Sequence, residues 1–407
     1  MRVVAIINTC IGGSTGKIAV GLYRHLTGSG TVCHFCYGRE DGPVHENYYR
    51  IGRRIHAVLH AAMTRVFGLQ GFGSVLPTRR LISYLRKNRV DTVFLLSPHG
   101  YYLNEPLFFR YLAEDGIRLI YLMIDEYPFT GKCTYCNGCT GYLAECRGRC
   151  PEKREYPKSL LFNGASALFR MKKAAYASLG SAVFVGPGYV VAQAKNSPLL
   201  QNKRLEVLDE AIDTAFYSPR GCAALREELG IRPEQKVLVC VAPYSLERKG
   251  CRYFVELARR FAGDPDYVFV HVGFDVESGA VSLPPNYIPI GFLRDQEKLA
   301  QYYSLGDLFV FPSLLDTMPN ACLEALACGT PLLCFDVSGM PYIADESVAV
   351  FVEPRNVDQL EQAVRAAPRK TSETIEICHK YALSRYDSRL YYQKLSAIAE
   401  NDRGFNT

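Results

Sequence analysis

Short runs of apolar, β-branched residues recur along the chain, and each is followed by a helical pattern. Such continuous apolar runs are typical of strands that are buried on both faces. Strands that alternate with helices predict a parallel, doubly wound α/β sheet. The runs span residues 2–7, 32–37, 92–96, 118–124 and 181–186 in the first half, and 236–242, 267–273, 308–313, 331–337 and 348–353 in the second.

These runs form two series, which turn residues separate around 216–235. The chain has 407 residues, enough for two domains of ordinary size. We therefore expect two Rossmann-like domains, over residues 1–215 and 216–380. Ligands bind at the carboxyl ends of such sheets, which predicts a cleft between the domains.

Composition excludes several other classes of protein. The chain is 48% hydrophobic and 22% charged, which indicates a globular and not a disordered protein. No apolar run approaches the ~18 residues that a membrane span needs, and the apolar N-terminus is too short for a signal peptide. We expect a cytoplasmic protein, whose 15 cysteines are then mostly thiols or metal ligands.

The stretch DTMPNACLE, residues 316–324, begins and ends with a carboxylate. In the predicted frame, Asp316 lies in the loop at the carboxyl end of a strand, and Glu324 lies about one turn into the following helix. We expect Asn320 or Thr317 to cap this helix and Gly329 to end it. The two acids could instead be a plain cap and a helix-face carboxylate.

The same stretch offers a binding site for a nucleotide sugar. The backbone N–H groups of residues 317–320 form a helix N-terminus that suits a phosphate or sugar oxygen. One carboxylate could accept hydrogen bonds from the hydroxyls of a sugar, and the other from a ribose diol.

The segment FPSLLDTMPNACLEALACGTPLLCFDVSGMPYI resembles the retaining glycosyltransferases of family 4, which have the two-domain GT-B fold. Their pattern is an acid, seven residues and Glu, followed by small residues, Gly and Pro. HGYYLN, PFTGKC and IDTAFYSP resemble a branch of that family that builds polysaccharides, so the resemblance covers most of the chain. It also implies that residues 381–407 hold a last helix that packs back on the first domain.

The resemblance implies a role for each residue of the donor site. Asp316 would contact the transferred sugar and Glu324 the ribose. Arg248 and Lys249, in the segment 242–261, would neutralise the leaving diphosphate in place of a divalent ion, so that no cofactor is needed for catalysis. Further donor contacts are implied for Gly12, Gly13, Leu293, Thr317, Met318, Pro319 and Asn320.

The chain departs from the family pattern near the donor sugar. The branch usually has a His where this chain has Ile124, and an isoleucine cannot give the hydrogen bonds of that His. Asp125 is kept, and His99 is the histidine left in the neighbouring motif. We expect Asp125 or His99 to take part of the lost role, although His99 could equally be a satisfied core histidine, whose nitrogens are bonded within the fold.

Five cysteines gather between residues 133 and 150. The spacing favours a structural zinc ion held by four thiolates, with free thiols, an iron–sulfur cluster and disulfides as alternatives. The resemblance implies the ligands Cys133, Cys139, Cys146 and Cys150, and leaves Cys136 as an extra thiol.

The stretch from Arg50 to Arg89 has nine Lys or Arg residues and no acid. It predicts either a solvated face of two helices or a patch that attracts an anionic membrane surface or a phosphorylated acceptor. Nucleic acid is disfavoured, because the stretch lacks interleaved aromatic residues for stacking on bases.

The sequence therefore predicts a retaining hexosyltransferase. It would move a sugar from a UDP- or GDP-sugar to a glycan acceptor, lipid-linked, for a capsule, O-antigen or exopolysaccharide, at the inner face of the cell membrane. The alternatives are another GT-B activity, such as a natural-product glycosyltransferase or a nucleotide-sugar epimerase, and a weakened nucleotide-sugar-binding protein.

Overall fold

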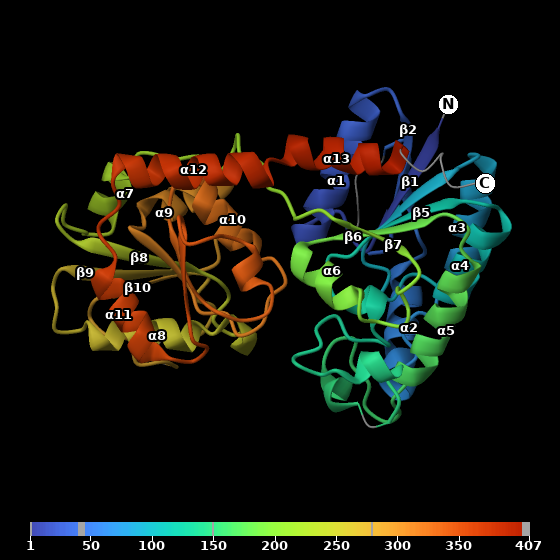
Figure 1. Ribbon diagram of the computed structural model, residues 1–407, viewed down its shortest axis with the longest axis horizontal. Helices are drawn as coiled ribbons and strands as arrows, with labels where there is room; N and C mark the ends of the chain where they lie inside the picture. Colours follow the sequence, from blue (N-terminus) through green and yellow to red (C-terminus); the bar gives the residue numbers. More distant parts are fainter. Residues whose placement is uncertain (1, 40–44, 149, 278–279, 401–407) are drawn as a thin grey trace. The chain divides into compact units, whose positions relative to one another are not determined.

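The computed structural model describes residues 2–39, 45–148, 150–277 and 280–400, and it divides into two compact units. One unit is Met1–Leu208 with Tyr392–Thr407, and the other is Asp209–Tyr391 (Figure 1). The chain thus crosses between the units after Leu208 and again after Tyr391. The sequence analysis predicted these boundaries after residues 215 and 380. Residues 401–407 of the predicted terminal segment lie outside the described residues.

The first unit is built on a seven-stranded sheet in the order β3-β2-β1-β4-β5-β6-β7, with every pair parallel. The strand order reverses between β1 and β4, and such a switch point is where α/β sheets bind ligands. The strands are β1 Val3–Asn8, β2 Val32–Tyr37, β3 Tyr48–Arg50, β4 Thr92–Leu95, β5 Arg118–Leu122, β6 Ala182–Gly186 and β7 Arg204–Val207.

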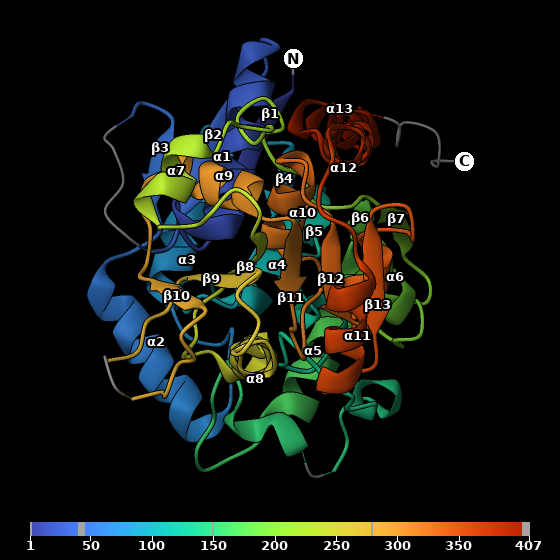
Figure 2. The same cartoon turned by 90° about the vertical axis from the view of Figure 1, so that its left-hand side faces the viewer.

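The second unit is built on a six-stranded parallel sheet in the order β10-β9-β8-β11-β12-β13, which Figure 2 shows from one end to the other. Its switch point lies between β8 and β11. The strands are β8 Lys236–Val241, β9 Tyr267–Val272, β10 Tyr287–Ile290, β11 Leu308–Phe311, β12 Leu332–Phe335 and β13 Ala349–Val352.

All ten strands expected from the apolar runs are present, so the prediction of two doubly wound parallel sheets is confirmed. Sequence patterns missed β3, β7 and β10. Each of these is at the edge of its sheet or short, and each is only partly buried, so it lacks the continuous apolar run of a central strand.

Helices cover both faces of each sheet. In the first unit α3, α4 and α5 pack on one face of the sheet, where they share a core with its strands. Helices α1 and α13 lie on the other face (Figure 1). The helices are α1 Gly13–Gly28, α2 Arg54–Phe67, α3 Val75–Lys87, α4 Glu105–Glu114, α5 Ala165–Ser178, α6 Gly188–Ala194 and α13 Ser388–Glu400.

In the second unit α8 packs with α11, and α10 packs with α9 and α12, on opposite faces of the sheet (Figure 1). The helices are α7 Ala223–Glu228, α8 Cys251–Arg260, α9 Gln296–Leu305, α10 Asn320–Ala327, α11 Val357–Ala366 and α12 Ser372–Tyr386. In the described part of the chain, no helix combines the length and the apolar character that crossing a membrane requires.

The end of the chain returns to the first unit through α13. The hydroxyl of Tyr392 donates a hydrogen bond of 3.3 Å to the carbonyl of Ile18 in α1, and the guanidinium of Arg2 donates to the carbonyl of Ala399. Arg118 of β5 donates to the carbonyl of Ile398 in the same way. The close approach of α13 to α1 depends on Gly21, because a Cβ at this position would lie 1.9 Å from the hydroxyl of Tyr392.

We predict that Gly21→Ala displaces Tyr392 and loosens α13. Overpacking of this kind costs about 1–3 kcal/mol of unfolding free energy. Limited proteolysis followed by mass spectrometry should show faster cleavage between residues 388 and 400. Gly28→Ala in the same helix is the matched control, because a Cβ there meets no atom within 4 Å. Equal cleavage rates in the two variants would contradict the prediction.

Candidate active site

The loop after β11 places a carboxylate at the switch point of the second sheet. Asp316 is 5% exposed, and its Oδ2 accepts a hydrogen bond of 2.9 Å from the hydroxyl of Ser313. Its backbone carbonyl accepts from the N–H of Gly339 at 3.0 Å. Ser313 therefore holds the carboxylate, and Gly339 holds the main chain of the same residue.

Two cations come to the same carboxylate from the loop after β8. The short helix Glu247–Lys249 carries them: Lys249 Nζ lies 2.8 Å from Asp316 Oδ2, and Arg248 Nη1 lies 3.2 Å from Oδ1. Lys249 is largely buried, with 14% of its side chain exposed. Since two cations share one carboxylate, the cluster has a net charge of +1 and can accept an anion.

The backbone fixes this pairing of loops. The carbonyl of Arg248 accepts a hydrogen bond of 2.7 Å from the N–H of Leu314. Gly250 follows at a left-handed φ of +64°, and a Cβ there would lie 1.9 Å from the carbonyl oxygen of Pro312. Only glycine fits this position, because it needs both the positive φ and the close approach. The two cations are thus placed by main-chain geometry.

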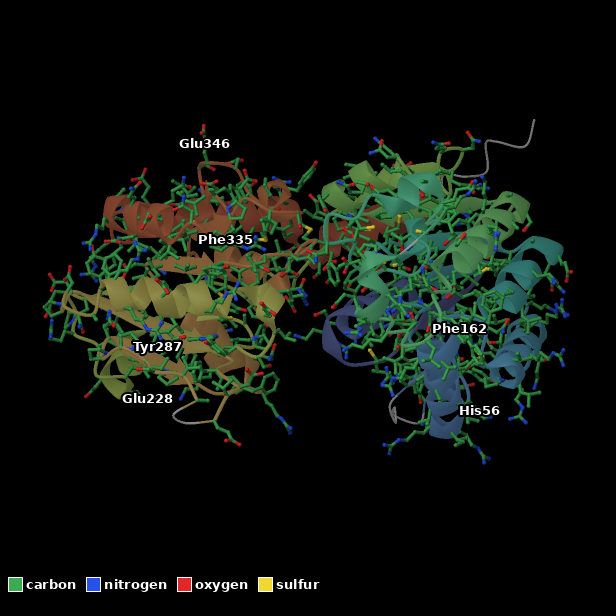
Figure 3. All side chains as sticks on the ribbon, turned by 90° about the horizontal axis from the view of Figure 1, so that it is seen from below. His56, Phe162, Glu228, Tyr287, Phe335 and Glu346 are labelled. Carbon is green, nitrogen blue, oxygen red and sulfur yellow. The ribbon has the colours of Figure 1, made fainter. Side chains whose placement is uncertain are left out.

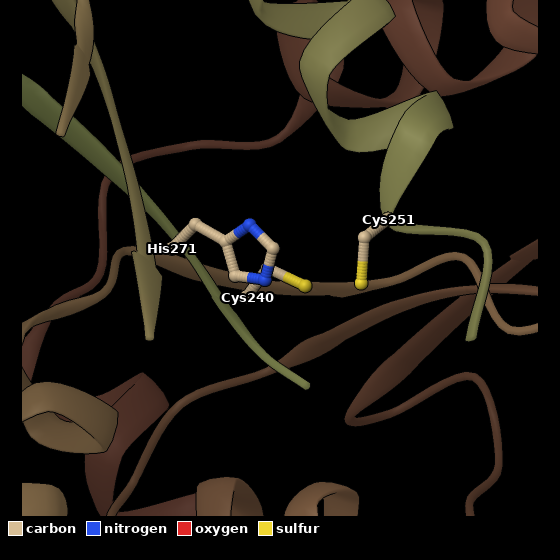
Figure 4. A group of neighbouring side chains, drawn as sticks. All are labelled: Cys240, Cys251 and His271. Atoms are coloured by element: carbon tan, nitrogen blue, oxygen red, sulfur yellow. The ribbon is translucent and has the colours of Figure 1, made fainter. Parts of the chain in front are cut away.

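Three buried side chains lie below the loop that carries the two cations, and no sequence motif predicted them (Figure 4). Cys240 of β8, Cys251 of α8 and His271 of β9 bring their ligand atoms within 4.8 Å of one another. His271 Nε2 lies 2.8 Å from the carbonyl of Ala242, and Nδ1 lies 2.6 Å from the hydroxyl of Tyr287. Because both ring nitrogens have partners within the protein, we assign the group a structural role under the loop.

Helix α10 begins at Asn320, after the N-cap Pro319. The expectation that Asn320 or Thr317 caps the helix was wrong, because no side chain forms a cap hydrogen bond to this described helix. A proline in that position has no side-chain acceptor, which leaves the N-terminal turn suited to an anion.

The residues that flank α10 are fixed as well. The side chain of Met318 is buried beneath the N-terminal turn, and its sulfur accepts a hydrogen bond of 3.2 Å from the N–H of Glu210. Gly329 follows the helix at φ +81°, as expected.

Glu324 is the fifth residue of α10 and is 8% exposed. Its Oε2 accepts a hydrogen bond of 2.7 Å from the hydroxyl of Tyr303 in α9. Burial, and then the charge of Glu324, raise the pKa of Tyr303 well above its usual range, so the phenol keeps its proton and donates. Leu293, for which the resemblance implies a donor contact, is half-buried against the core of the same unit.

In the first unit, Gly12 and Gly13 form the turn from β1 into α1. Gly12 is the N-cap and Gly13 the first residue of the helix, with φ +69° and no atom within 4 Å of an added Cβ. No side chain caps this described helix. A side chain at Gly13 would therefore meet no neighbour at the carboxyl end of β1, and the donor contact that the resemblance implies for Gly12 and Gly13 stays a prediction.

His99 and Asp125 meet at the carboxyl edge of the first sheet. His99 Nε2 lies 2.8 Å from Asp125 Oδ2, and both side chains are buried. The other carboxylate oxygen accepts from the N–H of Tyr127 at 3.0 Å. Ile124, beside them, is half-buried. His99 is thus the partner of Asp125, a contact that both a site histidine and a satisfied core histidine would make.

A network of buried charge holds the segment after Asp125, and sequence patterns gave no sign of it. Lys172 of α5 is fully buried and donates to the carbonyls of Tyr127 at 2.7 Å and Thr130 at 3.2 Å. The hydroxyl of Tyr127 donates to Glu105 Oε1 at 2.5 Å. Because burial lowers the pKa of Lys172 to about 8, the ammonium depends on these acceptors to stay charged.

The five clustered cysteines line one small hollow of about 30 Å³, together with the turn around Tyr142. All fifteen cysteines of the chain lie in the described part, and none of them forms a disulfide there. Within that part, only Cys240, Cys251 and His271 gather three ligand atoms as closely as 4.8 Å. The donor set of the cluster fits one zinc ion, but its thiols would have to draw closer to hold it.

Comparison with known proteins supports a glycosyltransferase. Residues 235–368, which contain the cations and both carboxylates, match the family model described as Glycosyl transferases group 1. The chain is 26% identical over 370 residues to WcaC of Escherichia coli K12, which is named as a glycosyl transferase of colanic acid biosynthesis. This match covers 86% of the chain and 87% of that protein.

Solved structures share the fold over nearly the whole chain. HepE of Anabaena, in complex with UDP, superposes with a TM-score of 0.67 at 12% identity and covers 98% of this chain and all of its own. WaaG, a glycosyltransferase involved in lipopolysaccharide biosynthesis, gives 0.65 at 15% identity and covers 98% and 100%. These likenesses show the GT-B fold, and the family match and WcaC indicate a glycosyltransferase.

Lys172 gives a test of the buried network by pH. Its pKa of about 8 in the folded chain is below its ordinary value of 10.5, so between these pH values the unfolded chain binds more protons. The free energy of unfolding of the wild type should therefore rise with pH relative to Lys172→Met, by about 1.4 kcal/mol for each unit between the two pKa values. Urea unfolding at pH 8 and 10.5 measures this, and parallel changes in both proteins would contradict it.

Proposed function

We propose that the protein is a retaining glycosyltransferase that transfers a sugar from a UDP- or GDP-sugar to a glycan acceptor in polysaccharide biosynthesis. The observation that carries the proposal is the cluster of Lys249, Arg248 and Asp316 at the switch point of the second sheet. The names of WcaC and WaaG support a polysaccharide or lipopolysaccharide product, and the complex of HepE supports a uridine nucleotide.

In this proposal Lys249 and Arg248 stabilise the diphosphate as it leaves. Negative charge develops there in the transition state, and fixed cations in a largely buried site need little reorganisation to meet it. Asp316 holds the cations in place and contacts the transferred sugar. Glu324, oriented by Tyr303, accepts from the ribose diol.

We propose front-side attack, in which the leaving phosphate takes the proton of the acceptor hydroxyl. The bond from the anomeric carbon to the diphosphate breaks, the bond to the acceptor oxygen forms on the same face, and the configuration is retained. The protein then supplies orientation and charge, without a divalent ion. His99 and Asp125 would supply hydrogen bonds near the sugar that Ile124 cannot give.

One observation favours a second candidate function. Ile124 stands where the resemblance expects a histidine, so the chain could bind a nucleotide sugar without transferring it efficiently. Incubation with donor and acceptor distinguishes the two by release of the nucleoside diphosphate. NMR of the new anomeric proton then tests retention.

We predict that one nucleotide sugar raises the melting temperature of the wild type, because it binds the folded chain only. Lys249→Ala and Glu324→Ala should each lose this shift, with affinity falling ~10- to 100-fold for each charge-assisted contact removed. Thermal shift with a panel of UDP- and GDP-sugars measures it. Lys380→Ala, which removes an exposed lysine of α12, is the matched control. A shift that survives in all three variants would contradict the donor site.

We also propose that the cysteine cluster holds a structural zinc ion through Cys133, Cys139, Cys146 and Cys150. Five thiols around a hollow that is large enough for one ion support it. Such an ion would brace the loop and take no part in the transfer. Elemental analysis should find one zinc per chain, which Cys146→Ser loses and Cys136→Ser keeps. Equal zinc contents in the two variants would contradict the assignment.

A further inference from the structure

A hollow of about 750 Å³ opens on the first unit at the carboxyl edge of its sheet. Residues that follow β1, β2 and β4 form one wall: Thr9 and Cys10, Gly38 and Arg39, and Tyr101. Helix α2 forms the facing wall. The hollow therefore has the position and the volume at which α/β sheets bind ligands.

Four arginines line this hollow, and among the lining residues that the structure describes none is acidic. Arg54 and Arg65 come from α2, Arg50 ends β3, and Arg39 follows β2. Guanidinium groups match phosphate oxygens in geometry and bind them through paired hydrogen bonds. Four of them around one space select an occupant with at least two negative charges, which a neutral sugar does not have.

The face of α2 between its two arginines is made of small apolar side chains: Ala57, Val58, Ala61 and Ala62. Arg54 and Arg65 are eleven residues apart, which is ~16 Å along a helix. Small apolar side chains thus line the wall of the hollow between the two arginines. The distance between the arginines leaves room for more than a single phosphate group.

Exposed apolar side chains continue from the hollow along α2. Leu59 is 61% exposed and Phe67 is 48% exposed. The segment 160–162 runs beside the end of the helix, because the N–H of Leu160 donates to the carbonyl of Arg65 and that of Phe162 to Val66. The ring of Phe162, which is labelled in Figure 3, stacks on that of Phe67 with the centroids 6.0 Å apart. Leu161, next to Phe162 in the chain, is 66% exposed.

We propose that this hollow binds the phosphate or diphosphate ester that joins the acceptor glycan to a lipid. The arginines bind the charged linkage, and the exposed apolar residues of α2 and 160–162 contact the lipid chain. Soluble proteins seldom expose large contiguous apolar patches, and here exposed apolar side chains adjoin a hollow whose charged lining residues, in the described part of the chain, are all arginines. The identification of this ligand as the acceptor rests on the proposed transfer, whereas the binding itself does not.

Calorimetric titration of the full chain with farnesyl diphosphate, inorganic diphosphate and farnesol tests the proposal. Farnesyl diphosphate carries both the charge and the apolar chain, and each of the other probes carries one of them. We expect farnesyl diphosphate to bind at least ~10-fold more tightly than either, because binding uses both parts. The double variant Arg54→Gln/Arg65→Gln should weaken it by ~10-fold or more, the loss expected for charged hydrogen bonds.

The matched control is Arg79→Gln/Arg110→Gln, which removes the same charge from exposed positions on α3 and α4 outside the hollow. Circular dichroism checks that both variants fold. Equal loss of affinity in the two double variants would overturn the proposal, as would equal binding of farnesol or of inorganic diphosphate. A chain that binds farnesyl diphosphate through Arg54 and Arg65 but responds to no nucleotide sugar would support this site and overturn the proposed transfer.

Discussion

The carboxylate of Asp316 is the contact on which the candidate donor site depends. It joins the loop after β11 to the loop after β8, the two strands at which the order of the second sheet reverses. Without it, two cations would lie side by side in a partly buried place and repel each other. With it, Lys249 and Arg248 are held together before any ligand arrives. The backbone bond from Leu314 to Arg248 and the glycine at 250 make the same connection in the main chain.

In the first unit, other contacts hold the polar side chains at the strand ends. His99 and Asp125 lie at the carboxyl edge of its sheet, and the segment after Asp125 is fixed by a buried ammonium, Lys172. A buried cation is costly unless acceptors surround it, and two backbone carbonyls do so here. Hydrogen bonds from a buried ammonium in the first unit, and ion pairs in the second, therefore hold the segments that carry polar side chains at the strand ends.

The sequence was sufficient to predict the central strands, because a strand buried on both faces must be apolar throughout. It did not predict β3, β7 or β10, where partial exposure removes that pattern. It also placed Asp316 in the loop after a strand and Glu324 in the following helix, since motif spacing follows the strand–loop–helix order. The cap of α10 was wrong, because Pro319 fills the position that a polar cap would take.

Long-range contacts explain what else the sequence could not predict. Lys172 contacts the segment after Asp125, although it lies more than forty residues further along the chain than Tyr127 and Thr130, which it bonds. Cys240, Cys251 and His271 come from three separate elements and form no motif. The hollow lined by four arginines needs the ends of several strands and one helix to be brought together. In the sequence, only the excess of basic residues between 50 and 89 indicated an anion-binding surface in this part of the chain.

The central claim is that the cations held by Asp316 bind the diphosphate of a nucleotide. The most direct test compares the affinities of the nucleoside diphosphate and monophosphate, for uridine and for guanosine, in the wild type and in Lys249→Met. The account predicts that the wild type prefers the diphosphate by ~10-fold or more, the scale of one charged hydrogen bond, and that the variant loses this preference. A preference that is unchanged in Lys249→Met would contradict it.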